Sequence, residues 1–137
     1  MERARSTGAM RTTRAASARR HIEAAVTMLH AGQLDCAVSL AAAGEGLLVG
    51  RVPTPYLDQL LDRVEPAGPH FDAREWLQSF REPSAVDVSE LDAAIVLLRA
   101  VATFIATCGH SSRAFDDFWD WANVTYPALR SRGRPAG

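Results

Sequence analysis

The stretch that decides the fold spans residues 91–108 and reads LDAAIVLLRAVATFIATC. Its apolar residues recur at steps of three and four, the period of a helix that buries one face. The residues on that face are Leu91, Ala94, Ile95, Leu98, Val101, Ala102 and Ile105. Residues 87–90 carry a capping signature, and Gly109 supplies a stop. The pattern predicts one long helix that is central to the domain or forms a dimer interface.

Two helices are predicted upstream, over residues 15–31 and from Leu34 to about Val49. Gly32 and Gln33 make a connection short enough for an antiparallel hairpin. The second helix has a stripe of unusually small residues, including Ala37, Ala41 and Gly44, which permits close helix approach.

Further helices are predicted over residues 55–64, over 71–80 and after Ser111 or Ser112. The last of these carries Phe115, Phe118, Trp119 and Ala122 at helical spacing. Alanine and leucine dominate the composition, which favours helices over strands. We therefore expect an all-α fold, an antiparallel helical bundle of about five helices.

The length of 137 residues suits one domain with its own core. We expect a basic, disordered N-terminal arm over residues 1–14, a helical domain over 15–125 and an Arg/Gly/Pro tail over 126–137. Residues 1–20 hold six arginines and one acid, the tail holds three arginines and no acid, and acids outnumber arginines between the two ends. The basic ends either contact nucleic acid or are simply solvated.

Other chemistry is sparse. Cys36 and Cys108 lie in apolar helical runs, so both are predicted to be buried free thiols. No pair among the four histidines has metal-ligand spacing, and no phosphate-binding glycine loop is present, so neither a metal nor a cofactor is expected. The apolar run from Ala93 to Cys108 is interrupted by Arg99 and is short for a membrane span. A bacterial cytoplasmic protein is the expectation.

Two short motifs add a family resemblance. Residues 41–48 read AAAGEGLL on the second predicted helix, and residues 71–79 read FDAREWLQS on a short one. With the hairpin and the long apolar helix, they resemble the HEPN superfamily of small helical bundles over roughly residues 15–125. Within it, the chain resembles an uncharacterised bacterial group whose second helix carries an Ala-Ala-Glu-Glu-like run.

The resemblance implies the residues of a metal-independent ribonuclease, but the histidine of its motif is missing in this chain. Catalytic HEPN proteins pair an arginine with a histidine after a gap of four to six residues and cleave RNA without a metal. In this chain Arg74 matches the arginine, while Ser79 stands at the histidine position. His70 follows Arg63 at the wider spacing, but two prolines and a glycine between them break the shared helix edge. The proton-transfer group is therefore missing from the motif.

Several interpretations remain open for these residues. Arg74 is either structural, bridging a dimer or pairing with an acid such as Glu45, or it contacts a ligand. The first hypothesis is a non-catalytic HEPN-like interaction module that homodimerises and has a possible protein partner. The second is a metal-independent ribonuclease, or an RNA- or nucleotide-binding protein, that uses Arg74 at a dimer cleft with His70, Glu45 or Ser79 nearby. A purely structural helical protein is the third.

Overall fold

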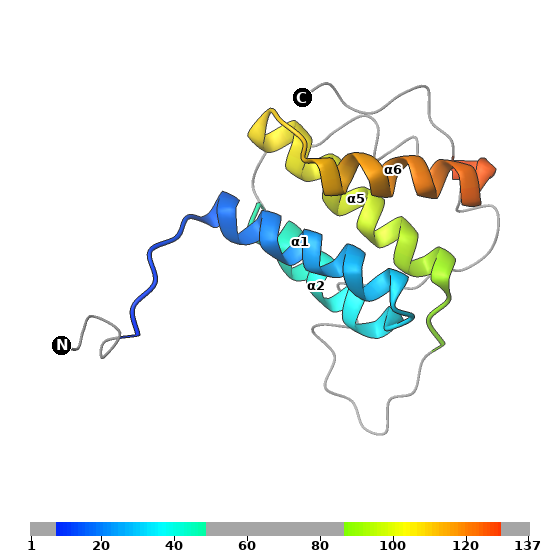
Figure 1. Cartoon of the computed structure of the whole chain (residues 1–137), viewed down its shortest axis with the longest axis horizontal. Coiled ribbons are helices and arrows are strands. Elements are labelled where there is room, and N and C mark those ends of the chain that lie inside the picture. The colour runs from blue at the N-terminus through cyan, green and yellow to red at the C-terminus, as the bar shows by residue number, and fades with distance from the viewer. Residues whose placement is uncertain (1–7, 49–86, 130–137) are drawn as a thin grey trace.

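The computed structural model describes residues 8–48 and 87–129 of the chain (Figure 1). Helix accounts for 77% of these residues and none of them lies in a strand, so this part of the chain is all-α, as predicted. The predicted helices over residues 55–64 and 71–80 lie outside it. The elements are α1 Arg14–His30, α2 Leu34–Gly46, α5 Glu90–Cys108, α6 Arg113–Thr125 and a short 3₁₀ turn η3 Pro127–Leu129.

The predicted helical hairpin is formed by α1 and α2. Thr13 caps α1, its side chain accepting a hydrogen bond from the Ala16 amide at 3.0 Å. Gly32 has a φ of 80°, a left-handed conformation that glycine adopts without steric cost, and it turns the chain into α2. The bond from Arg14 Nε to the Leu47 carbonyl, 3.1 Å long, joins the start of α1 to the end of α2. The two helices are therefore antiparallel.

The second helix ends at Gly46, three residues before the predicted end at Val49, which lies outside the described residues. Its small-residue stripe faces α1, as the sequence indicated. A Cβ placed on Gly44 would lie 2.8 Å from Ile22 Cγ1 and 3.1 Å from the Ala18 carbonyl oxygen. Only glycine therefore allows α1 and α2 to approach this closely at that point.

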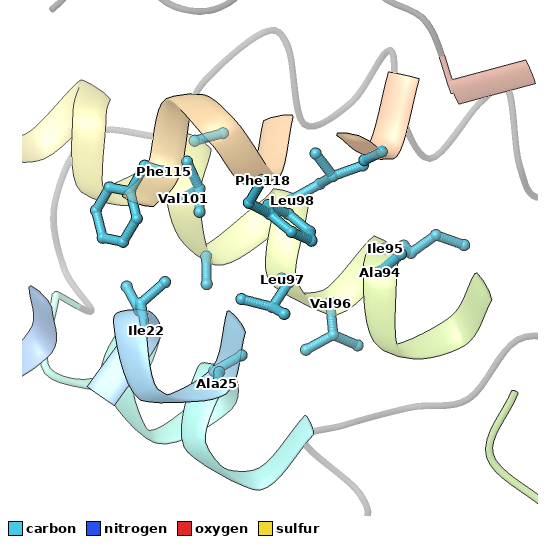
Figure 2. Packing of buried hydrophobic residues seen from close by; sticks show 14 of the residues in the cluster. Ile22, Ala25, Ala94, Ile95, Val96, Leu97, Leu98, Val101, Phe115 and Phe118 are labelled. Atoms are coloured by element: carbon cyan, nitrogen blue, oxygen red, sulfur yellow. The ribbon is translucent and has the colours of Figure 1, made fainter. Parts of the chain in front are cut away.

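The long central helix is α5. Its N-cap is Ser89, which lies within the signature expected at residues 87–90 and exchanges reciprocal hydrogen bonds with Asp92 in a capping box. Gly109 ends it with a φ of 79°, as predicted. Most of its side chains are buried against α1, α2 and α6. Figure 2 shows Leu97 among Ile22 and Ala25 of α1. It also shows Val101 and Leu98 on the side of Phe115 and Phe118 of α6.

By length and composition alone, α5 is long and apolar enough to cross a membrane, with a mean hydropathy of 1.9 over an 18-residue window. The helix is longer than the apolar run that the sequence suggested, because it begins at Glu90. In the structure 61% of that window is buried against the protein, and a core helix satisfies the same criterion. A helix that is buried on most of its sides is expected to be apolar all round.

The last helix, α6, runs back along α5. Ser112 caps it through a 3.2 Å bond from the Phe115 amide, and the predicted face of Phe115, Phe118, Trp119 and Ala122 is buried. The Tyr126 hydroxyl, after the end of α6, donates to Glu90 at the start of α5. These contacts define two ends of the bundle. The end of α1 and the starts of α2 and α5 lie at one end, and the start of α1 and the end of α2 lie at the other.

The prediction of two buried thiols is wrong for Cys36, which is exposed, whereas Cys108 is half-buried. Cys36 lies in the first turn of α2, whose buried residues are Ala37, Val38, Ala41 and Gly44. At 100° per residue, position 36 points well away from that face. The apolar composition of the run concealed this orientation.

Candidate functional site

Glu45 occupies the α2–α5 junction, where it is the acid nearest the small-residue stripe. Its Oε2 atom accepts a 3.0 Å hydrogen bond from Arg99 Nε and a 3.1 Å bond from Thr103 Oγ1. Both donors come from α5, one helical turn apart on the same face. One carboxylate oxygen thus joins two helices that are more than fifty residues apart in the chain.

Packing explains why Glu45 reaches α5. Gly44 fixes the close contact of α2 with α1, and the next residue points about 100° round the helix. The Glu45 side chain is only 18% exposed, whereas that of Arg99 is 40% exposed. The carboxylate is therefore largely withdrawn from water, and the guanidinium lies at the edge of the junction.

This geometry limits what Glu45 can do chemically. A carboxylate acting as a general base needs an accessible lone pair within hydrogen-bond reach of the substrate proton. Oε2 already accepts two donors, and Oε1, which has no hydrogen-bond partner among the described residues, belongs to a side chain that is only 18% exposed to solvent. Removing either donor would leave a half-buried charge with less compensation. The arrangement is that of an interhelical strut.

The other predicted site residues, His70, Arg74 and Ser79, lie outside the described residues. The expected contact between Glu45 and Arg74 is therefore not tested. What sequence reasoning missed is the pairing with Arg99 and Thr103. Arg99 is the one charged residue within the apolar run of residues 93–108, and that isolation was the available signal for a buried acid opposite it.

A second polar feature lies where α1 and α6 end and α5 begins. We call it the acid–aromatic patch, and it consists of His30, Glu90, Trp121 and Tyr126. The Trp121 ring has the His30 ring 4.8 Å away and the Tyr126 ring 6.1 Å away, centroid to centroid, with interplanar angles of 89° and 81°. Two rings thus stand almost perpendicular to the indole. His30 and Glu90 are exposed, and Trp121 and Tyr126 are half-buried.

The phenol of this patch is electrostatically perturbed. Partial burial raises the pKa of Tyr126 to about 12, and the hydrogen bond to Glu90 and the negative charge of that carboxylate act in the same direction. The phenol therefore stays protonated and keeps donating to Glu90 at neutral pH. Within the described residues, the second oxygen of Glu90, Oε2, has no hydrogen-bond partner.

The remaining candidates are dispersed. His21 contacts the Ser17 carbonyl within α1, and His110 contacts the Cys108 carbonyl at the end of α5. Within residues 8–48 and 87–129, no three His, Cys, Asp or Glu residues gather as a metal site would require. Asp117 and Asp120 are exposed on α6, while Asp116 is half-buried and accepts a bond from Ser111. None of these forms a site together with Glu45.

No protein-family model matches the chain, and no similar curated protein or solved structure was found.

Proposed function

We propose that the chain is a non-catalytic interaction module, an antiparallel helical bundle of the HEPN-like type that homodimerises and binds a protein partner. The observation that carries the proposal is the engagement of Glu45. This acid is the one residue of the suspected polar site that the described residues include, and its carboxylate is held by Arg99 and Thr103. A strut of this kind stabilises helix packing, whereas a general base must exchange protons with a substrate.

The sequence supports the same conclusion at the other side of the suspected site. Ser79 stands where a catalytic histidine would be needed, and a serine hydroxyl at its ordinary acidity does not take up protons at neutral pH. Without Glu45 or a histidine at the motif position to move the proton, Arg74 alone would supply only charge stabilisation. Binding without cleavage is the function that remains.

A cleavage assay tests this proposal. Wild type, Arg74→Ala and Glu45→Gln are each incubated with a labelled single-stranded RNA in EDTA, and the products are separated on a denaturing gel. We expect no cleavage above buffer in any sample, with circular dichroism confirming that the variants are folded. Cleavage by wild type that disappears in Arg74→Ala would overturn the proposal and favour the metal-independent ribonuclease instead.

A further inference from the structure

The segment before α1 carries side chains that none of the described residues 8–48 and 87–129 covers. Residues 8–13 are exposed and extend away from the helices (Figure 1). The Met10 residue is 67% exposed. Arg11 is exposed as well, and its side chain makes no hydrogen bond or ion pair in the described structure. A large apolar side chain beside an unpaired guanidinium is unusual on a solvated segment, and suits one that packs on another surface.

The acid–aromatic patch has the complementary chemistry. Methionine sulfur makes favourable contacts with aromatic rings, and a guanidinium stacks on an aromatic face. Trp121 offers a half-buried indole with perpendicular rings beside it, and the Glu90 carboxylate has an oxygen to accept from a guanidinium. Met10 and Arg11 thus match the patch in both polarity and charge.

The length of α1 determines whether Met10 and Arg11 can reach the acid–aromatic patch of their own chain. The patch lies at the end of α1, and the segment lies at its start, so the 17 residues of the helix separate them by about 26 Å. Met10 is joined to Arg14 by four residue steps, which span at most roughly 14 Å when fully extended. The segment therefore falls short of its own patch. It can reach the patch of a second copy.

We propose that two copies associate side by side and antiparallel, and that Met10 and Arg11 of each copy dock on the acid–aromatic patch of the other. A two-fold arrangement makes the contact twice and closes, so it gives a dimer and no filament. The inference rests on the homodimer of the proposed function and names its interface.

The distribution of charge supports an antiparallel pairing. Arg11, Arg14 and Arg20 lie at the start of α1, and none has a carboxylate partner in the described structure: Arg14 donates to a carbonyl and Arg20 to the Thr12 hydroxyl. The opposite end holds acids of the α2 and α5 starts. These acids are Asp35, Asp87, Glu90 and Asp92. An antiparallel dimer places each basic end against an acidic end.

A charge-swap experiment tests the inference. Dimer dissociation constants are measured by sedimentation equilibrium for the full chain as wild type, Arg11→Glu, Glu90→Arg and the double variant. We expect each single reversal to weaken the dimer about tenfold and the double variant to regain most of the loss. Met10→Ser, which removes the apolar half of the contact, is expected to weaken it by a similar factor. Arg113→Glu reverses another exposed charge, at the start of α6, and should leave the constant within about twofold.

Each alternative result contradicts a different statement. A wild-type dimer that is insensitive to Arg11→Glu, Glu90→Arg and Met10→Ser overturns the docked segment and leaves the homodimer standing. Single reversals that weaken the dimer without rescue in the double variant overturn the pairing of Arg11 with Glu90. A wild type that stays monomeric at the highest concentration overturns both the interface and the homodimer, while the non-catalytic function is still judged by RNA cleavage.

Discussion

The carboxylates of Glu45 and Glu90 differ in burial and in the partners that balance their charge. At the α2–α5 junction, a largely buried carboxylate meets two donors of its own chain, and the acid Glu45 is matched by the base Arg99. At the acid–aromatic patch, Glu90 meets only a phenol, and no arginine of the described residues contacts it. The Glu45 charge is thus paired with an arginine of its own chain, whereas the Glu90 charge has no cationic partner among the described residues. The enclosed pair links two helices of one chain, and the exposed patch is the surface that we propose to dock a second copy.

The largest effect is expected at the contact between α1 and α2, which holds in place the helix that carries Glu45. We expect Gly44→Val to destabilise the fold by about 2–3 kcal/mol, because the new side chain collides with Ile22 and with the backbone of Ala18. Urea unfolding followed by circular dichroism measures the loss. Gly46→Ala is the matched control two residues on, where a Cβ meets nothing within 4 Å. It should stabilise by up to about 1 kcal/mol, and a similar loss in both variants would contradict the close-approach role.

The ion pair itself should give the next largest effect. Glu45→Ala leaves the Arg99 guanidinium and the Thr103 hydroxyl without their acceptor, and we expect a loss of about 1–2 kcal/mol. This loss of stability is small for the removal of a charged partner, because the Arg99 side chain is 40% exposed and its guanidinium can be rehydrated. A double-mutant cycle with Arg99→Ala isolates the pair. A coupling energy indistinguishable from zero would mean that the contact contributes nothing to stability.

Most helix bounds were predictable from the sequence, whereas the contact of Glu45 with Arg99 and Thr103 at the α2–α5 junction was not. The helical period placed α1, α5 and α6 to within a residue or two, because burial of one face leaves a regular pattern. Glycine and serine located their ends for equally local reasons. The partner of Glu45 depends on which faces of α2 and α5 meet, and that is set by tertiary packing that no local pattern records. The same limit explains why Cys36 was expected inside and lies outside.

Two threonines on one face of α5 provide a finer comparison. Thr103 Oγ1 donates to Glu45, whereas Thr107 Oγ1, one turn on, is buried without a hydrogen-bond partner in the described structure. Thr103→Val should destabilise by about 1 kcal/mol, because Glu45 loses a donor. Thr107→Val replaces an unsatisfied hydroxyl with a methyl group of similar shape and should stabilise by about 1 kcal/mol. Thermal unfolding of both variants shows the opposite signs; equal signs would contradict the assignment of the two hydroxyls.

In the acid–aromatic patch, the Tyr126 hydroxyl should contribute little to stability at neutral pH, and this contribution should be lost in alkali. Tyr126→Phe removes one exposed hydrogen bond to Glu90, and we expect it to cost roughly 0.5 kcal/mol at pH 7. The folded state holds the phenolic proton more tightly than the unfolded chain, since the pKa of Tyr126 is raised from 10.0 to about 12. The stabilisation is therefore fully present below pH 10 and is lost as the pH rises through 12.

Urea unfolding of wild type and Tyr126→Phe at steps between pH 9 and pH 12 isolates this contribution, because every other titrating group is common to both proteins. The wild type should lose stability more steeply than the variant, so the small difference at pH 7 narrows as the phenol ionises and repels Glu90. Ultraviolet titration of the phenols supplies the assignment, since the variant lacks the late-titrating component. Parallel stability curves would show that Tyr126 and Glu90 are not coupled, and the patch would then lose its link between α6 and α5.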